Sequence, residues 1–128
     1  MNLHVKTILV VDDEPILRTI VREILHEEGY VVIEAEDGQV MLEVMARERP
    51  DLVLMDVMMP GVDGRDAYRQ LRSRPENQDV PVVMMSAAVQ SHGIDPSIAG
   101  FVPKPFDITD LIALVVRLIG HPNSSNAT

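Results

Sequence analysis

The sequence contains no cysteine. Disulfide bonds, thiolate nucleophiles and cysteine-based zinc sites are therefore excluded, and cysteine usage says nothing about the redox compartment. Histidine is also sparse, and the four histidines are scattered without the spacing of converging metal ligands. We therefore expect each of them to be a solvated surface residue: His4, His26, His92 and His121.

Basic residues are scarce as well. The 128 residues include 11 Lys and Arg against 20 Asp and Glu, which gives a formal net charge of -9 at pH 7. A protein that binds nucleic acid or anionic lipid directly needs a basic face to neutralise phosphates. We therefore expect no direct nucleic-acid contact, and a partner with a basic surface suits this chain better.

Long hydrophobic runs are the third absence. No apolar run approaches the roughly 18 residues that a membrane span needs, and the start of the chain lacks the features of a signal peptide. We expect a cytoplasmic protein with no membrane insertion. Because 46% of the 128 residues are hydrophobic, the chain can form one ordinary domain with one core.

Short apolar runs instead alternate with segments of helical periodicity. Residues 58–64 are expected to form a loop, and Gly93 and Pro96 allow at most a short or broken fourth helix between residues 87 and 99. A last helix, capped by Asp107 or Thr109, ends at Gly120. The expected strands are residues 8–11, 30–33, 52–56, 81–86 and 101–102, and the other expected helices are 15–28, 40–49 and 65–73.

Each expected helix has one apolar face. In the first helix, Pro15 suits the first position and Gly29 suits the C-cap. The helix expected at residues 65–73 should direct the Tyr68 side chain to the core. Strands that alternate with helices imply right-handed crossovers and a parallel sheet covered on both faces, so we expect a three-layer α/β/α sandwich. The expected core face of the first helix comprises Leu17, Ile20, Val21, Ile24 and Leu25.

Polar side chains follow four of the expected strands. Asp12 and Asp13 end the first strand, Asp56 the third, Ser86 the fourth, and Lys104 follows the fifth. Ligands of open parallel sheets bind beyond the carboxyl ends of the strands, so these five residues should share one edge. Each could be a solvated strand-end residue, but five of them at one edge favour a site.

Three neighbouring carboxylates repel one another unless a compensating charge is present. A hard divalent cation supplies that charge, and Mg²⁺ typically takes one or two carboxylates together with phosphate oxygens. The ammonium of Lys104 and the hydroxyl of Ser86 suit phosphoryl oxygens. The residues alone therefore predict a magnesium-assisted phosphoryl site.

Three blocks of the sequence resemble the receiver domain of two-component response regulators. They are ILVVDDE at 8–14, LMDVMMPGVDG at 54–64 and KPF at 104–106, and the similarity extends from Thr7 to Ile119. The acidic pair alone is weak evidence, whereas the three blocks in family order are specific. The resemblance, to the single-domain, chemotaxis-regulator-like type, implies a flavodoxin-like fold with a five-stranded parallel sheet of order 2-1-3-4-5.

The resemblance also implies a function and its residues. Asp56 would be the phosphoacceptor, taking a phosphoryl group from the phosphohistidine of a sensor histidine kinase or phosphotransfer protein. The chain would then be a signalling switch for a downstream protein target, not an enzyme, and would catalyse only its own phosphorylation and dephosphorylation. The implied Mg²⁺ ligands are Asp12 (partly through water), Asp13, Asp56 and the backbone carbonyl of Met58.

Further family features map onto the second half of the chain. Ser86 and Lys104 would hold the phosphoryl oxygens, and Phe101 fits the switch aromatic that turns inward when the Ser86 hydroxyl moves; a plain core position is the alternative for Phe101. The Lys104-Pro105 peptide bond is expected to be cis. Met58 and Ala88 line the approach of hydrolytic water in the family, and their uncharged side chains predict no acceleration of hydrolysis.

The expected domain organisation is one receiver domain over residues 1–122 and a polar, disordered tail over 123–128. From residues 120–128 we expect no linker to an output domain after Ile119. The chain is therefore interpreted as a single-domain regulator or as an excised receiver of a hybrid kinase or longer regulator. Because the region between Ser86 and Lys104 departs from the family pattern, the resemblance predicts partner docking and dimerisation less well than it predicts the site.

Other functions fit less well. A haloacid-dehalogenase-type phosphatase needs a second Asp two residues after the nucleophile, where this chain has Met58. A flavodoxin-like flavin carrier needs a phosphate cradle after the first strand, where residues 12–14 would repel phosphate. The sequence has neither a GxGxxG nor a Walker A motif. A phosphorylation-independent receiver-like adaptor remains the alternative.

Overall fold

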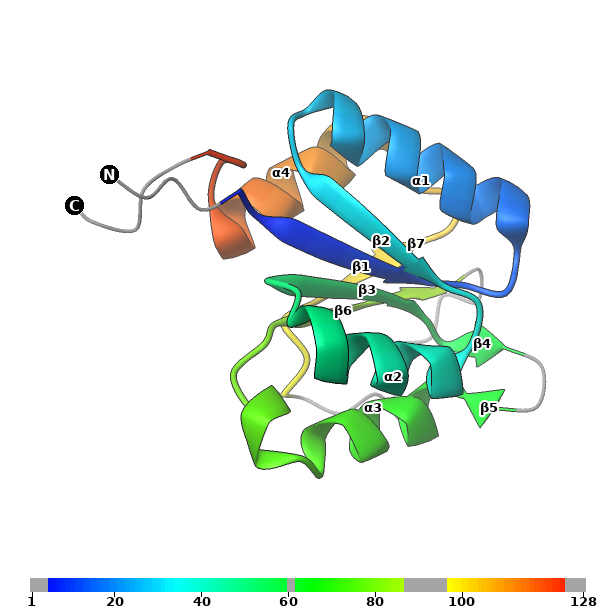
Figure 1. The fold of residues 1–128 in the computed structure, drawn as a ribbon. Helices are drawn as coiled ribbons and strands as arrows, with labels where there is room; N and C mark the ends of the chain where they lie inside the picture. Colours follow the sequence, from blue (N-terminus) through cyan, green and yellow to red (C-terminus); the bar gives the residue numbers. More distant parts are fainter. Residues whose placement is uncertain (1–4, 60–61, 87–96, 124–128) are drawn as a thin grey trace.

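The computed structural model describes residues 5–59, 62–86 and 97–123. Five strands form one parallel sheet in the order β2-β1-β3-β6-β7, which confirms the expected order of the five main strands (Figure 1). The strands are β1 (Thr7–Val11), β2 (Val31–Ala35), β3 (Leu52–Asp56), β6 (Val82–Ser86) and β7 (Gly100–Pro103).

Helices cover both faces of this sheet, as the alternating pattern predicted. In Figure 1, α1 and α4 lie on one face, and α2 and α3 lie on the other. The helices span α1 (Pro15–Glu27), α2 (Gly38–Glu48), α3 (Gly64–Arg72) and α4 (Ile108–Ile119), and a 3₁₀ turn, η1, spans Pro75–Asn77.

The core has two halves because successive strand residues point to opposite faces. On the α2 and α3 side, Leu9 and Val53 pack with the helices, and on the α1 and α4 side, Ile8 and Leu52 do the same. All five residues of β3 are buried. A central strand covered on both faces accounts for its continuous apolar sequence and brings Asp56 to the edge of the core.

The sequence misplaced one residue of α1. Val21 and Leu25 are fully buried, but Ile20, which we expected on the core face, is 46% exposed. At about 100° per residue, Ile20 lies roughly 120° around the helix from the midpoint between Val21 and Leu25. The apolar periodicity therefore marked a wider stripe than the sheet covers. Gly29 (φ +108°) follows the C-cap residue, Glu28, by one position.

Two short strands lie within the segment that was expected to be a loop. They are β4 (Met58–Met59) and β5 (Val62–Asp63), which pair antiparallel to each other. The expected short fourth helix and Ala88 fall within residues 87–96, which lie outside the described residues, as does the tail from residue 124. Residues 97–99 are described and form a turn before β7.

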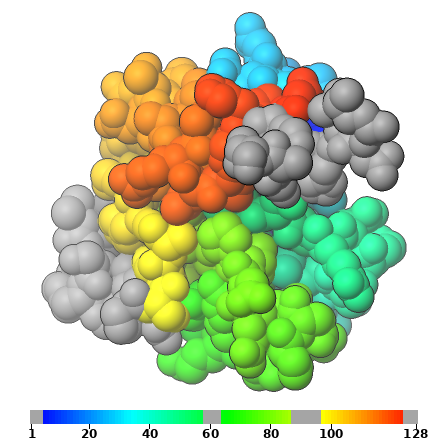
Figure 2. Space-filling view, turned by 90° about the vertical axis from the view of Figure 1, so that its left-hand side faces the viewer, coloured from blue at the N-terminus to red at the C-terminus, as the bar shows by residue number. Residues whose placement is uncertain are grey.

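The opposite edge of the sheet, at the amino-terminal ends of the strands, is closed by the end of the chain. The backbone N–H of Lys6 donates to the carbonyl of Pro122 at 3.0 Å, and the Tyr30 hydroxyl donates to the carbonyl of Gly120 at 2.7 Å. Figure 2 faces this edge, where the orange-to-red surface of α4 and the residues after it occupies the upper part. In the described part of the chain, no helix combines the length and apolarity that crossing a membrane requires.

Candidate functional site

Asp12 follows β1 and is completely buried. Its backbone N–H donates to the carbonyl of Ala35 at the end of β2, at 3.1 Å. Its carboxylate accepts a hydrogen bond from the backbone N–H of Glu14 at 2.9 Å. The strand end therefore fixes the backbone of Asp12, and the turn into α1 fixes one carboxylate oxygen.

Asp56 is the last residue of β3, and its side chain is 5% exposed. Lys104 joins it to Asp12: the Nζ atom lies 2.9 Å from Oδ2 of Asp12 and 3.2 Å from Oδ2 of Asp56. Asp12 and Lys104 are 92 residues apart in sequence, so the parallel sheet brings this contact about. The structure thus unites the ends of three strands through one ammonium group.

Lys104 is placed by the strand before it. Its backbone N–H donates to the carbonyl of Ser86 at 2.8 Å, which continues the pairing of β6 with β7. The Lys104-Pro105 bond is cis, as the resemblance predicted. Burial by itself lowers the pKa of the Lys104 ammonium. The hydrogen bond and attraction to Asp12, together with the weaker influence of Asp56, outweigh burial and raise this pKa above its ordinary value.

Of the other expected site residues, Ser86 and Met58 lie at this edge, whereas Phe101 lies within β7. Ser86 ends β6 and is 4% exposed. Phe101 pairs in register with Met84 and is half-buried against the core half beneath α2 and α3. Its packing is therefore partly that of a core residue. The backbone of Met58 begins the hairpin after Asp56.

The arrangement of acids fits a divalent cation. One carboxylate oxygen from each of Asp12, Asp13 and Asp56 can be chosen so that all three lie within 4.8 Å of one another. Asp12 and Asp56 are buried and Asp13 is half-buried, so water screens their repulsion poorly. In the described part of the chain, the Lys104 ammonium contacts two of these three carboxylates, Asp12 and Asp56, and one positive charge does not balance three negative ones. An all-oxygen donor set with that charge suits Mg²⁺.

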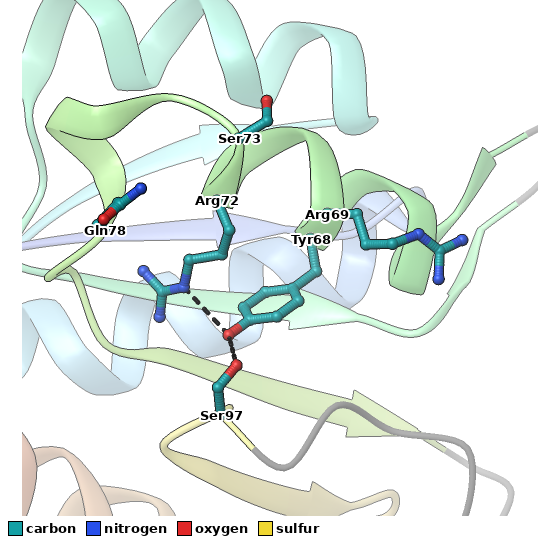
Figure 3. A pocket seen from close by; sticks show the side chains of 6 residues that line it. All are labelled: Tyr68, Arg69, Arg72, Ser73, Gln78 and Ser97. Atoms are coloured by element: carbon teal, nitrogen blue, oxygen red, sulfur yellow. Dashed lines mark hydrogen bonds between the residues drawn. The ribbon is translucent and has the colours of Figure 1, made fainter.

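A pocket of about 560 Å³ lies at a different place, lined by α3 and the segment before β7 (Figure 3). Within it, the hydroxyls of Tyr68 and Ser97 lie 2.5 Å apart, and Nε of Arg72 donates to the Tyr68 hydroxyl at 3.0 Å. The acids of the candidate site do not line it. These side chains bond to one another, so we assign them a structural role in tying α3 to the start of β7.

Two features of the site escaped the sequence reasoning. Arg18 donates from Nη1 to the backbone carbonyl of Asp12 at 2.6 Å, and periodicity had marked it only as a polar residue of α1. A Cβ atom on Gly64 would lie 2.5 Å from the backbone oxygen of Asp56. Gly64 belongs to the motif block that we identified, but only the tertiary structure shows which backbone it approaches.

Comparisons with known proteins identify a family for this chain. The model of the response regulator receiver domain matches residues 8–116. This chain belongs to the response regulator receiver domains. The family is a signalling switch whose members interact with histidine kinases. The receiver domain described here shares the fold of the solved receivers.

Curated relatives extend beyond the length of this receiver domain. It is 37% identical over 124 residues to the response regulator MprA of Mycobacterium leprae, covering 94% of this chain and 54% of that protein. The match to MprA of Mycobacterium ulcerans is 39% over 116 residues, covering 88% and 49%. The chain therefore spans about half the length of these relatives.

Solved receivers match over nearly their full length. The receiver domain of a sensor histidine kinase from Pseudomonas aeruginosa, with a magnesium ion in its active-site cleft, gives a TM-score of 0.83 at 28% identity, covering 90% of this chain and 98% of that one. A Thermotoga maritima response regulator in complex with Mg²⁺ and BeF gives 0.80 at 33% identity, covering 88% and 98%. These receivers bind magnesium in the solved structures.

Proposed function

We propose that this receiver domain accepts a phosphoryl group on Asp56 from the phosphohistidine of a sensor histidine kinase or phosphotransfer protein. An oxygen of the Asp56 carboxylate forms the new P–O bond while the P–N bond of phosphohistidine breaks. The electron pair of the broken bond stays on the imidazole nitrogen, which takes a proton from solvent. A carboxylate can form such an acyl phosphate, and the remaining work is positioning and charge neutralisation.

The bridge that Lys104 makes between Asp12 and Asp56 is the observation that carries this proposal. It holds a cation beside the acceptor oxygen, where an incoming phosphoryl group brings further negative charge. The hydroxyl of Ser86, at the neighbouring strand end, would donate to a second phosphoryl oxygen. Lys104 and Ser86 thus act on the transferred group, while Asp56 receives it.

The donor set would hold Mg²⁺ through Asp12, Asp13 and Asp56, with the backbone carbonyl of Met58 as a further oxygen ligand. Bound Mg²⁺ would supply positive charge that offsets the carboxylates and the phosphoryl oxygens. The carboxylates contribute their fixed positions, since Asp12 and Asp56 are held by the strand ends and by Lys104. In this proposal, the domain catalyses only its own phosphorylation and dephosphorylation.

The output of the switch is a protein surface. We propose that Ser86, on contacting the phosphoryl group, changes the packing of Phe101, which already lies half-buried in the neighbouring strand. A downstream protein target would read this change, and we propose a cytoplasmic location without direct nucleic-acid contact by this domain. The domain is taken to cover residues 1–122, either as a regulator of its own or as the receiver of a hybrid kinase or longer regulator.

Intact mass spectrometry after incubation with acetyl phosphate and Mg²⁺ tests the acceptor. We expect the wild type to gain the mass of one phosphoryl group and Asp56→Asn to gain none, because an amide oxygen does not form a stable acyl phosphate. No gain in the wild type, or an equal gain in the variant, would contradict the proposal. The first result would favour the alternative of a phosphorylation-independent adaptor.

A beryllofluoride titration followed by NMR tests the output. We expect chemical-shift changes that begin near Asp56 and extend to Phe101. Changes confined to the surroundings of Asp56 would show that this domain lacks the proposed switch.

A further inference from the structure

The Asp12 backbone is held from two directions. Its N–H donates to the carbonyl of Ala35 at 3.1 Å, as in the adjoining sheet. Its carbonyl accepts from Nη1 of Arg18 at 2.6 Å, from one turn into α1. The carboxylate meanwhile contacts the N–H of Glu14 and the Nζ of Lys104, both at 2.9 Å. Arg18 is thus the contact that joins this strand end to the helix covering it.

Arg18 is itself held in place. Its Nε atom lies 3.1 Å from Oε1 of Glu34, and the side chains are 16% and 27% exposed. Glu34 is on β2 and pairs in register with Val10, two residues before Asp12. A planar guanidinium bonded to a carboxylate through one nitrogen and to a carbonyl through another has little freedom to rotate. The β2 strand thus fixes Arg18, and Arg18 fixes the carbonyl of Asp12.

We infer that Arg18, held by Glu34, is a positioning residue for the acidic site. It sets the orientation of the peptide unit between Asp12 and Asp13, and through it the directions of both carboxylates. The inference rests on the proposed function, because it assigns Arg18 a role in the binding of Mg²⁺ and in phosphoryl transfer to Asp56. Residues that orient metal ligands typically affect metal affinity by about 10- to 100-fold when they are replaced.

Arg22 offers a matched control on the same helix. Its Nη1 atom lies 2.8 Å from Oε2 of Glu34, so it shares the same carboxylate partner as Arg18. The hydrogen bond described for Arg22 goes to Glu34, and its other described ion pair is with Glu23 at 3.7 Å, so neither involves Asp12. Removing either arginine takes one ion pair from Glu34, but only the removal of Arg18 releases the Asp12 carbonyl.

The experiment compares Arg18→Met with Arg22→Met in the full chain. Calorimetry measures the Kd for Mg²⁺, and urea unfolding in EDTA measures stability without the metal. We expect Arg18→Met to weaken Mg²⁺ binding about 10-fold or more. Arg22→Met should change it less than about two-fold, even if it lowers stability equally, since exposed ion pairs contribute little to a distant site. Equal effects of the two variants on the Kd would overturn the inference.

Arg18→Lys covers the case in which Arg18→Met does not fold. One ammonium on a shorter head group cannot reproduce the fork that spans Glu34 and the Asp12 carbonyl. We expect it to fold and still to weaken Mg²⁺ binding several-fold, with slower phosphorylation by acetyl phosphate; a wild-type Kd and rate would overturn the inference. If wild type binds Mg²⁺ and is phosphorylated while Arg18→Lys matches it, the inference alone fails. If wild type binds no Mg²⁺, the proposed function fails as well.

Discussion

The two edges of the sheet are held together by different kinds of contact. At the amino edge, the Tyr30 hydroxyl donates to the Gly120 carbonyl, the Lys6 N–H to the Pro122 carbonyl, and the Thr7 N–H to the Asp51 carboxylate. At the carboxyl edge, the buried groups are charged, and the ammonium of Lys104 bridges Asp12 and Asp56. One edge is closed by ordinary hydrogen bonds, and the other concentrates like charges.

This difference indicates which edge of the sheet should respond to the binding of a ligand. The hydrogen bonds described at the amino edge pair groups of the chain with one another, so they form without a bound ligand. The three clustered carboxylates at the carboxyl edge repel one another, and a bound divalent cation would offset the repulsion that Lys104 leaves. We therefore expect the carboxyl edge to respond to metal and phosphoryl groups, and the amino edge to respond only to mutation, temperature and pH.

The largest effect is expected from Gly64→Ala. Its new Cβ would lie 2.5 Å from the Asp56 backbone oxygen and 2.7 Å from Cα of Val57, and backbone atoms have little room to move. We expect the free energy of unfolding to fall by about 2 kcal/mol or more, with loss of phosphorylation.

Urea unfolding measures the change, and Gly100→Ala is the control. A Cβ there would meet side-chain atoms at ordinary contact distances, Leu114 at 3.4 Å and Val83 at 3.8 Å. Equal stability of the two alanine variants would show that the carboxyl edge tolerates displacement and would weaken the comparison of the two edges.

Metal removal should have the next largest effect. Mg²⁺ at ten times its Kd should raise the free energy of unfolding by about 1.4 kcal/mol over EDTA, by mass action on the folded state. Asp13→Asn should lose most of this increment, because it removes one charged ligand, whereas Tyr30→Phe should retain it. Parallel urea titrations with Mg²⁺ and with EDTA test this. An increment that Asp13→Asn keeps would place the metal elsewhere.

The smallest effect is expected from Tyr30→Phe at the amino edge. Loss of the hydrogen bond to Gly120 should cost about 1 kcal/mol at neutral pH, without changing Mg²⁺ binding. The pKa of Tyr30 is raised above 10.0, first by burial and then by the negative charge of Glu28. The unfolded chain therefore ionises first as pH rises.

The stability that the raised Tyr30 pKa provides is present below about pH 10 and is lost as pH rises through the folded pKa. Tyr30→Phe should accordingly lose stability less steeply above pH 10. Lys104, whose pKa is also raised, is present in both proteins, so its contribution cancels in the difference. Equal slopes in thermal unfolding scans from pH 9 to 11 would contradict this account.

Most elements could be read from the sequence because their patterns are local. The run before Asp56 indicated a doubly covered strand, and β3 is buried throughout. The Asp107 side chain caps α4, as expected, by accepting from the N–H of Asp110 at 3.1 Å. The prediction that Ile20 faces the core was wrong because the apolar stripe of α1 is wider than the part of the helix that contacts the sheet. No local sequence pattern indicates where that contact ends.

The residues of the candidate site could be grouped from the sequence, but the residues that hold them in position could not. Strand ends in a parallel sheet meet at one edge by topology alone, so the acids, Ser86 and Lys104 could be grouped without coordinates. Arg18 and Glu34 could not, because each is an ordinary polar residue in its own element. Their meaning depends on β2 lying beside β1 and on the angle at which α1 crosses both.

The sequence by itself determined the alternation of strands and helices, the acidic edge and the family to which the chain belongs. These follow from hydrophobic periodicity, turn residues and motif spacing, which act over a few residues. The tertiary structure alone decided that Lys104 bridges Asp12 and Asp56, that Gly64 abuts the backbone of Asp56, and that Arg18 holds the Asp12 carbonyl. Such contacts depend on how closely the elements approach one another, and only the packing of the whole sheet and its helices sets that approach.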